Sequence, residues 1–377
     1  MLYTESEVLE FVQEEDVKFI RLAFFDTTGK QKNISIMAQT ILILLTLLGG
    51  ISLCIYGMTV MSEGVLKIFG VQVRASLRTL SSHRMSGFWF GQWMTMLIQS
   101  SSAATMMVVG FVSTGLLSLS QSISVIMGAN VGTTITAWIV SLFGYSVPIG
   151  YLAIPLVVFA IPFYLSRHVG RKPIGEVLMG FALMILGITL FISYMPSPTD
   201  YPAVHEWVSL LSSWSFGSVL IFVVVGILFT ILIQSSSATI MFALVLCASG
   251  WITFIMALAM VIGDNVGTTL TTIIGSNKAN VTAHRASYAH LMFNLFGMIW
   301  ALCLIYPISY LVESIIGPTP SPTAIACSVA AFHTGFNLIT SLILIGFVPK
   351  IDAMLRKFIP VVTDEDEEAH LSFLHGG

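Results

Sequence analysis

Long apolar stretches with few charged residues follow one another along most of the chain. Seven of them reach the roughly 20 residues that a helix needs to cross a bilayer, and they lie at 41–62, 123–146, 147–165, 174–195, 252–276, 286–309 and 322–348. Two further apolar stretches, 86–117 and 216–250, are interrupted in the middle by polar residues. We expect each of these two to form a re-entrant helical hairpin rather than one straight span. The pattern predicts an all-α membrane protein with about seven transmembrane helices plus two re-entrant hairpins.

The composition agrees with a membrane protein and excludes an ordinary soluble domain. Hydrophobic residues make up 56% of the chain and charged residues only 9%, with a mean hydropathy of +0.90, whereas soluble domains contain about 25% charged residues. The four cysteines are scattered and have no metal-binding or redox spacing. We expect no organic cofactor and no nucleic-acid partner.

Basic residues are confined to a few short segments. Four of the 16 lysines and arginines precede residue 37, and the other 12 lie at 67–84, 167–172, 278–285 and 350–357. The connections at 196–214 and 310–321 contain none. If each hairpin adds no crossing, all 12 fall on one face, which the positive-inside rule makes cytoplasmic. This topology puts the C-terminus inside and residue 40 outside.

Residues 1–36 differ from the rest because they are charged and contain no spanning run. The run Val17-Lys18-Phe19-Ile20-Arg21-Leu22, then Phe25-Asp26 and Gly29, resembles the extreme N-terminus of glutamine synthetases. That resemblance implies one amphipathic helix and one strand. None of that enzyme's nucleotide, metal or glutamate residues follow, so no such activity is implied. We interpret 1–36 as a fusion or a gene-model join, with Met37 as the natural start of the membrane part.

A seven-residue run occurs twice, once in each interrupted stretch. Leu-Ile-Gln-Ser-Ser-Ser-Ala stands at Leu97–Ala103 and again at Leu232–Ala238. Asn-Val-Gly-Thr-Thr follows at Asn130–Thr134 and Asn265–Thr269, so both patterns recur with the same offset of 135 residues. The common offset predicts two repeats. On this basis 37–173 is repeat 1, 174–350 is repeat 2 with an additional C-terminal helix, and 351–377 is an acidic cytoplasmic tail.

The repeated polar runs are costly in lipid unless their groups are used, because every polar group there needs a partner within the protein. Consecutive hydroxyls are useful where a helix is interrupted, and such interruptions form substrate and ion sites in transporters built from repeats. There, helix N-termini favour an anion, while oxygen atoms ligate a hard cation. No lysine or arginine lies near either run. A bound dianion therefore needs helix dipoles and a co-bound Na⁺ to balance its charge.

The two repeats differ at one ionisable position. Ala129 precedes Asn130 in the first copy, whereas Asp264 precedes Asn265 in the second. An ionisable group in a spanning segment is a functional candidate by default, and a carboxylate beside Asn265 and Thr268 suits a sodium ligand. The alternative that stays open is a buried aspartate that caps a broken helix.

A third pair of similar segments lies late in the chain. His290 and Asn294, like His333 and Asn337, occupy a His-x-x-Phe-Asn-Leu pattern. Residues four apart share one helix face, so each pair can contact a neighbouring hairpin. We interpret them as structural polar contacts that support the site.

Two other classes of function compete with a transport site. An intramembrane serine hydrolase needs one serine activated by a base, such as His290 or His333, and an oxyanion hole. Two symmetric serine triplets do not resemble that arrangement. A membrane scaffold would use the polar runs only to pack helices, and Gln99→Ala would then impair folding without selectively abolishing substrate binding. The equal offset of both patterns favours the transport site.

These motifs together resemble the type II sodium/phosphate cotransporter family. Its marks are two Gln-Ser-Ser-Ser motifs, each followed by a Gly-x-Asn-φ-Gly-Thr segment in which φ is apolar, and both copies are present. The His-x-x-Phe-Asn pattern with Tyr306-Pro307 also matches, and the resemblance covers about residues 38–350. It implies two inverted repeats with phosphate and Na⁺ held between the hairpins near the membrane midplane, and alternating access to that site.

The residues and the resemblance together give three sets of candidates. The substrate-binding set is Gln99, Ser100, Ser101, Ser102, Gln234, Ser235, Ser236, Ser237, Asn130 and Asn265. The Na⁺ set is Gln99, Ser102, Thr133, Thr134, Gln234, Ser237, Thr239, Asp264, Thr268 and Thr269. The supporting set is His290, Asn294, His333 and Asn337.

The expected function is a secondary active transporter, not an enzyme, that couples Na⁺ to the movement of inorganic phosphate across a bacterial inner membrane. Phosphate export, or a related oxyanion on the same site, stays open as an alternative. The resemblance implies membrane lipid as a partner and leaves open a homodimer and a missing PhoU-like cytoplasmic domain. Animal members of the family are thought to start inside, whereas the charge map places residue 40 outside, so the direction of transport is open.

Overall fold

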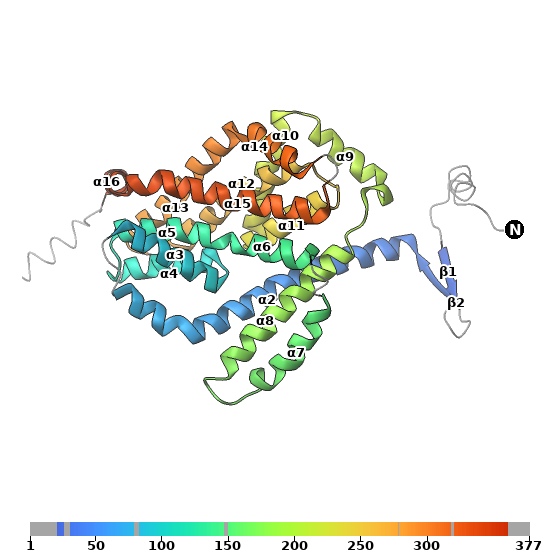
Figure 1. The fold of residues 1–377 in the computed structure, drawn as a ribbon, viewed down its shortest axis with the longest axis horizontal. Coiled ribbons are helices and arrows are strands. Elements are labelled where there is room, and N and C mark those ends of the chain that lie inside the picture. The colour runs from blue at the N-terminus through green and yellow to red at the C-terminus, as the bar shows by residue number, and fades with distance from the viewer. Residues whose placement is uncertain are drawn as a thin grey trace, which may run out of the picture.

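The computed structural model describes residues 21–25, 31–78, 83–146, 150–277, 279–317 and 320–360. From Ile36 onward these residues are almost entirely helical (Figure 1). Before that point, β1 (Arg21–Phe25) and β2 (Gln31–Ser35) form an antiparallel pair. The prediction of a single strand in 1–36 is therefore wrong. The first strand is followed after five residues by a second one, and this is a connection length typical of hairpins. The expected helix falls within 1–20, outside the described residues.

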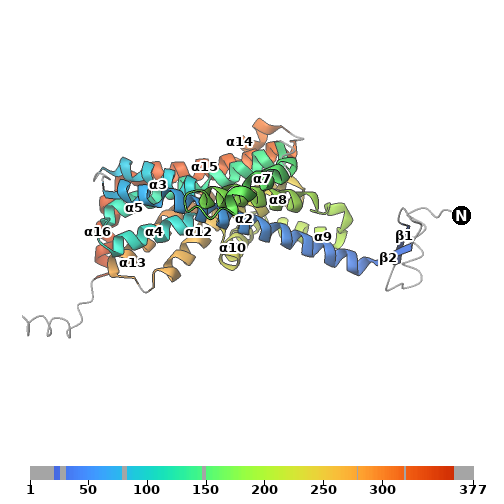
Figure 2. The same ribbon diagram turned by 90° about the horizontal axis from the view of Figure 1, so that it is seen from below.

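One group of helices is α2 (Ile36–Arg78), α7 (Gly150–Tyr164) and α8 (Lys172–Ser193), which lie side by side (Figures 1 and 2). Helices α2 and α8 touch through their backbones. A Cβ on Gly57 would collide with the Gly180 carbonyl oxygen, and a Cβ on Gly180 would collide with that of Gly57. Small residues permit this close approach in membrane helices.

Each repeat contains a helix that enters the Gln-Ser-Ser-Ser run, a helix that leaves it, a turn and a further helix. In the first repeat these are α3 (Arg84–Ile98), α4 (Ser101–Ser113) and α5 (Leu119–Thr133), continued by α6 (Ile135–Ser141) and η1 (Leu142–Ser146). In the second they are α10 (Phe216–Ile233), α11 (Ser236–Ala248) and α12 (Phe254–Gly275). The turns contain Gly115 at φ 73° and Gly250 at φ 80°, a conformation that glycine adopts without strain.

The remaining elements are η2 (Pro198–Asp200), α9 (Pro202–Ser212), α13 (Val281–Cys303), α14 (Ile305–Ile316), α15 (Pro322–Leu344), η3 (Ile345–Phe347) and α16 (Val348–Phe358). Helices α13 and α15 carry the two His-Asn pairs. Both pack against α5 and α12, which carry the Asn-Val-Gly-Thr-Thr runs. The elements that the sequence singled out therefore meet in one part of the fold.

Among the described residues, seven helices are long and apolar enough to cross a membrane: Thr40–Gln72, Leu119–Ser141, Lys172–Ser193, Phe216–Ile233, Phe254–Gly275, Val281–Cys303 and Pro322–Phe358. Six overlap expected spans. The expected span 147–165 corresponds to α7, which has only 15 residues and contains Pro155 and Pro162. Helix α10 takes its place among the seven. The span expected at 41–62 is longer than predicted, because no proline stops α2 before Arg78.

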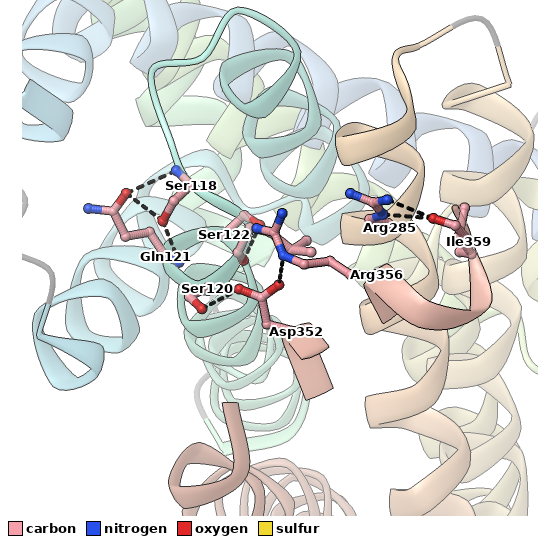
Figure 3. Close-up of polar contacts among 9 residues, drawn as sticks. Ser118, Ser120, Gln121, Ser122, Arg285, Asp352, Arg356 and Ile359 are labelled. Carbon is pink, nitrogen blue, oxygen red and sulfur yellow. Dashed lines mark hydrogen bonds and ion pairs between the residues drawn. The ribbon is translucent and has the colours of Figure 1, made fainter. Parts of the chain in front are cut away.

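Helix α16 lies against α5 and α13 at the C-terminal end of the described chain (Figure 3). Its apolar side is anchored by Val348 and Leu355, which are buried in the core that α3, α4 and α5 share. On its polar side, Ser120 Oγ of α5 donates to Asp352 Oδ2 at 2.6 Å. Residues 351–358 therefore belong to a docked helix and not to the acidic tail expected from residue 351. The acidic run 364–368 lies outside the described residues.

A buried arginine holds the end of α16. Arg285 of α13 donates through Nε and Nη2 to the Ile359 carbonyl oxygen, at 2.9 and 2.7 Å, and this carbonyl lies just beyond the last residue of the helix (Figure 3). Arg285 is only 5% exposed. The pair is a charge-assisted contact between two helices that are distant in sequence.

We expect Arg285→Ala to destabilise the protein by about 2 kcal/mol and to release α16, because hydrogen bonds to a charged group contribute about 1.5–3 kcal/mol. Thermal unfolding in detergent and the rate of tryptic cleavage at Arg356 and Lys357 measure the two effects. The control is Lys350→Ala on the exposed side of the same helix. Unchanged melting together with unchanged cleavage would show that Arg285 does not hold the helix.

Candidate functional site

Both Gln-Ser-Ser-Ser runs break their helices in the same way. Gln99 and Gln234 follow α3 and α10 in the left-handed conformation, at φ 56°, ψ 22° and φ 55°, ψ 28°. For a residue other than glycine this backbone costs of order 1–3 kcal/mol and is concentrated at functional sites. Ser100 and Ser235 then begin α4 and α11, and each hydroxyl accepts a hydrogen bond from the backbone three residues on, at 3.2 and 3.3 Å. The interruption predicted at each run is confirmed.

The common offset of 135 residues extends from the sequence to the backbone. A Cβ on Gly128 would collide with the carbonyl oxygen of Phe88, and a Cβ on Gly263 with that of Val223. Each position in the second repeat is the first-repeat position shifted by the same offset. The helix before the break and the helix that carries Asn-Val-Gly-Thr-Thr therefore touch at equivalent points in both repeats.

The two runs share one cavity of about 290 Å³. The lining residues that belong to the two runs are Gln99, Ser100, Ser102, Ala103, Gln234, Ser235, Ser236 and Ser237. The lining residues that belong to α2 are Ile55, Met58, Thr59, Ser62, Glu63 and Leu66. The first turns of α4 and α11 border the cavity, so two helix N-termini adjoin it. Helix N-termini carry about +0.5 charge and present backbone N–H groups to anions. Ser101, although in the run, does not line this cavity.

Thr136 of α6 joins the two runs. Its hydroxyl donates to Gln99 Oε1 at 3.0 Å and lies 3.5 Å from the hydroxyl of Ser237. Gln99 is 8% exposed and also donates through its amide to the Met96 carbonyl, whereas Gln234 is exposed to the cavity. The first glutamine is therefore fixed on both sides and the second is accessible.

Asp264 is fully buried behind the second run. Its Oδ1 accepts a hydrogen bond from Thr230 at 2.8 Å, and Thr230 lies 2.8 Å from the Thr239 hydroxyl. Thr239 in turn donates to the Ser235 carbonyl at 3.2 Å, and Ser235 lines the cavity. Among the described residues, Asp264 Oδ2 has no hydrogen-bond partner. A buried carboxylate oxygen without a donor, beside two hydroxyls, is a set of hard oxygen atoms that suits a cation.

The two histidines contact the asparagines of the Asn-Val-Gly-Thr-Thr runs. His290 Nε2 donates to Asn130 Oδ1 at 3.0 Å, and His333 Nε2 donates to Asn265 Oδ1 at 3.3 Å. Asn294 and Asn337 donate back to the carbonyls of their own histidines at 3.1 and 2.9 Å, and Asn337 also accepts from Asn265 at 2.8 Å. All six side chains are buried, so they form a layer that positions α5 and α12.

The structure places several predicted site residues away from the cavity. Asn130 and Asn265 face the histidines. The hydroxyls of four of the five predicted threonines donate to backbone carbonyls within their own helices: Thr133 to Ala129, Thr134 to Val131, Thr268 to Asp264 and Thr269 to Val266. None of these six residues belongs to the cavity lining. Of the residues that the structure describes, only those of the two repeated runs and of α2 line the cavity.

Several residues near the site were not predicted from the sequence, among them the whole α2 wall. Thr230 contacts Asp264, Thr136 joins the two runs, and Glu63 lines the cavity. A signal for Thr230 was present, because Thr95 and Thr230 each stand four residues before a motif glutamine. No comparable signal marked Glu63, which lies 36 residues before Gln99 and reaches the cavity only through the packing of α2.

The geometry offers little support for serine catalysis. In the part of the chain that the structure describes, the hydrogen bonds of His290 and His333 go to asparagine side chains and not to motif serines. A nucleophilic serine needs a base within hydrogen-bond reach. The paired helix N-termini and the shared cavity fit ligand binding instead.

Comparison with known proteins gives one family. The Na⁺/Pi-cotransporter family matches residues 53–193 and 204–317. YjbB of Escherichia coli (strain K12), whose name gives inorganic phosphate export as a provisional role, is 30% identical over 327 residues. That match covers 86% of this chain and 57% of YjbB, so the chain spans little more than half the length of that relative.

Other relatives include YqeW of Bacillus subtilis (strain 168), named as uncharacterised, at 26% identity over 85% of this chain and 99% of that protein. The sodium-dependent phosphate transport protein 2A of Ovis aries is 48% identical over 61 residues, which are 16% of this chain and 10% of the sheep protein. No solved structure matches. The resemblance of residues 1–36 to glutamine synthetase stays a prediction.

Proposed function

The chain belongs to the Na⁺/Pi-cotransporter family, and on that premise we propose that it carries inorganic phosphate together with Na⁺ across the cell membrane. The family is one of transporters and not of enzymes, as the sequence predicted. The seven apolar helices make the chain a multi-pass membrane protein. We further propose that its two repeats are inverted in the membrane, with each helix-break-helix unit a re-entrant hairpin.

One observation carries the phosphate assignment: both Gln-Ser-Ser-Ser runs open onto a single cavity. Two helix N-termini and the hydroxyls of Ser102 and Ser237 supply hydrogen-bond donors from two directions there. A tetrahedral oxyanion accepts hydrogen bonds all around its surface, so donors from two converging runs suit it better than donors from one. The site would open alternately to each side of the membrane.

Sodium is the coupling ion that this chemistry favours. Among the described residues, no lysine or arginine lines the cavity, so a cation must balance a phosphate dianion beyond what two helix dipoles supply. Asp264 with Thr230 and Thr239 offers oxygen atoms for one Na⁺, and Asp264 Oδ2, which has no hydrogen-bond partner in the described part of the chain, can ligate it. The chain of contacts from Asp264 through Thr239 to Ser235 connects that position to the cavity.

The direction of transport has two candidates. A Na⁺ gradient directed inward favours uptake, whereas the name of YjbB favours export on the same site. A homodimer and a PhoU-like cytoplasmic domain stay predictions, as does the cytoplasmic position of the 12 basic residues that follow residue 36.

The decisive experiment measures radiolabelled phosphate flux in proteoliposomes. We expect phosphate to accumulate above equilibrium when a Na⁺ gradient is imposed, and to stop accumulating when a sodium ionophore dissipates that gradient. Reversing the gradient tests export, and competition with arsenate and sulfate tests the choice of oxyanion. No flux, or flux that is equal when K⁺ replaces Na⁺, would refute the proposal.

A further inference from the structure

One wall of the shared cavity comes from α2, far from both motif runs in sequence. The lining residues of this wall are Ile55, Met58, Thr59, Ser62, Glu63 and Leu66. Their spacing of three or four residues places them on one face of the helix. The face is apolar at Ile55 and Met58 and becomes polar at Thr59, Ser62 and Glu63. The cavity is therefore bounded by a third polar surface besides the two runs.

Glu63 is the one ionisable side chain among the described residues that line the cavity. The nearest basic residue on the same helix is Lys67, one turn further on. Its Nζ lies 2.8 Å from both carboxylate oxygens of Glu176 on α8, which is only 7% exposed. Lys67 therefore pairs with Glu176, and its charge also acts on Glu63 one turn away. The three groups together keep a net charge of −1, which Glu63 brings to the cavity wall.

A carboxylate beside a phosphate site needs a cation between them. The two helix N-termini contribute about +1 in total, whereas a phosphate dianion and Glu63 together contribute about −3. The deficit corresponds to about two monovalent cations with Glu63 present and about one without it. Asp264 does not enter this sum because it faces Thr230 and lies outside the cavity.

We propose that Glu63 is a cation-binding residue of the cavity and sets the number of Na⁺ ions that accompany each phosphate. The proposal rests on the proposed function. The Glu63 carboxylate, with the hydroxyls of Thr59 and Ser62 on the same wall, gives the hard oxygen atoms that Na⁺ requires. A Na⁺ at this wall shares the cavity with the serine runs and so can bridge Glu63 and a phosphate bound to those runs.

The test compares Glu63→Gln with the parent in proteoliposomes, using ²²Na⁺ and radiolabelled phosphate together. We expect the ratio of Na⁺ to phosphate to fall by about one, and the Na⁺ concentration for half-maximal flux to rise about tenfold, equivalent to about 1.4 kcal/mol. Glu63→Asp keeps the charge and is expected to keep the ratio. Glu206→Gln on α9, an exposed position outside the cavity, is the matched control.

A second measurement does not depend on transport. Na⁺ added to the detergent-purified parent is expected to raise its melting temperature more than it raises that of Glu63→Gln, because a ligand stabilises the state that binds it. An unchanged Na⁺ to phosphate ratio and an unchanged Na⁺ shift in Glu63→Gln would overturn the proposal. Absence of Na⁺-dependent flux in the parent would instead overturn the proposed function, so the two failures are distinguishable.

Discussion

Replacing Gln99 with alanine is expected to lower Na⁺-driven phosphate flux by about 30- to 100-fold. The variant loses the hydrogen bond from Thr136 and the one to the Met96 carbonyl, which together fix the break between α3 and α4. Two such bonds are worth about 2–3 kcal/mol, and each 1.4 kcal/mol corresponds to a factor of ten. The initial rate of phosphate uptake into proteoliposomes measures the effect.

Thr136→Val tests the same contact from its other side. It removes the donor to Gln99 and also the contact with Ser237, so we expect a loss of similar size. Gln72→Ala near the end of α2, outside the cavity lining, is the matched control and should transport at the parent rate. A Gln99→Ala protein that folds and transports at more than half the parent rate would contradict the assignment of this glutamine to the site.

The broken helices could be predicted because their signal is local. A polar run such as Gln99–Ser102 cannot continue an apolar helix in lipid without unpaired groups, so its position marks the interruption. The duplication predicted a second interruption at the other run, and the φ and ψ angles of Gln99 and Gln234 agree closely. Both features follow from the residues themselves and need no knowledge of the packing.

The wall of the cavity that α2 supplies could not be predicted, because it depends on which helices pack together. Glu63 reaches the site only because α2 lies across both runs, an arrangement that no motif encodes. The threonines of the Asn-Val-Gly-Thr-Thr runs were expected to line the site, yet Thr133 and Thr268 bond to carbonyls of their own helices. A threonine hydroxyl in a helix readily bonds to the carbonyl one turn back, and sequence alone does not reveal when it does so.

The limits of the helix predictions have a similar physical origin. Hydrophobicity predicted a span at 147–165 equal to the others, but Pro155 and Pro162 divide that stretch and α7 is short. At the other end, residues 351–358 looked like the start of a charged tail. Leu355 stands among charged residues, a pattern typical of an amphipathic helix with one apolar side. Arg285 and Ser120, both distant in sequence, hold α16 in place.

Replacing Asp264 with asparagine is expected to remove one coupled Na⁺ and so to weaken the Na⁺ dependence of phosphate flux, while leaving the melting temperature equal or higher. The asparagine keeps the shape of the side chain and its contact with Thr230 but removes the charge that would bind Na⁺. A buried carboxylate without a cation is costly, so its removal should not destabilise the protein measured without Na⁺. Asp264 lies inside the continuous helix α12, so the alternative that it caps a broken helix is wrong. A purely structural role, in which its carboxylate only accepts the hydrogen bond from Thr230, predicts the opposite result, a lower melting temperature together with unchanged Na⁺ dependence, because a hydrogen bond to a charged group is stronger than one to a neutral amide.

Flux as a function of Na⁺ concentration, combined with thermal unfolding in Na⁺-free buffer, separates these two roles of Asp264. Asp200→Asn in η2, at an exposed position, is the matched control and should change neither quantity. Thr230→Val removes the hydroxyl that bonds to Asp264 Oδ1, and we expect it to raise the Na⁺ requirement without removing it, because the carboxylate stays. An Asp264→Asn protein with the same half-activating Na⁺ concentration as the parent would exclude Asp264 from the coupling site and leave Glu63 as the acidic residue at which Na⁺ acts.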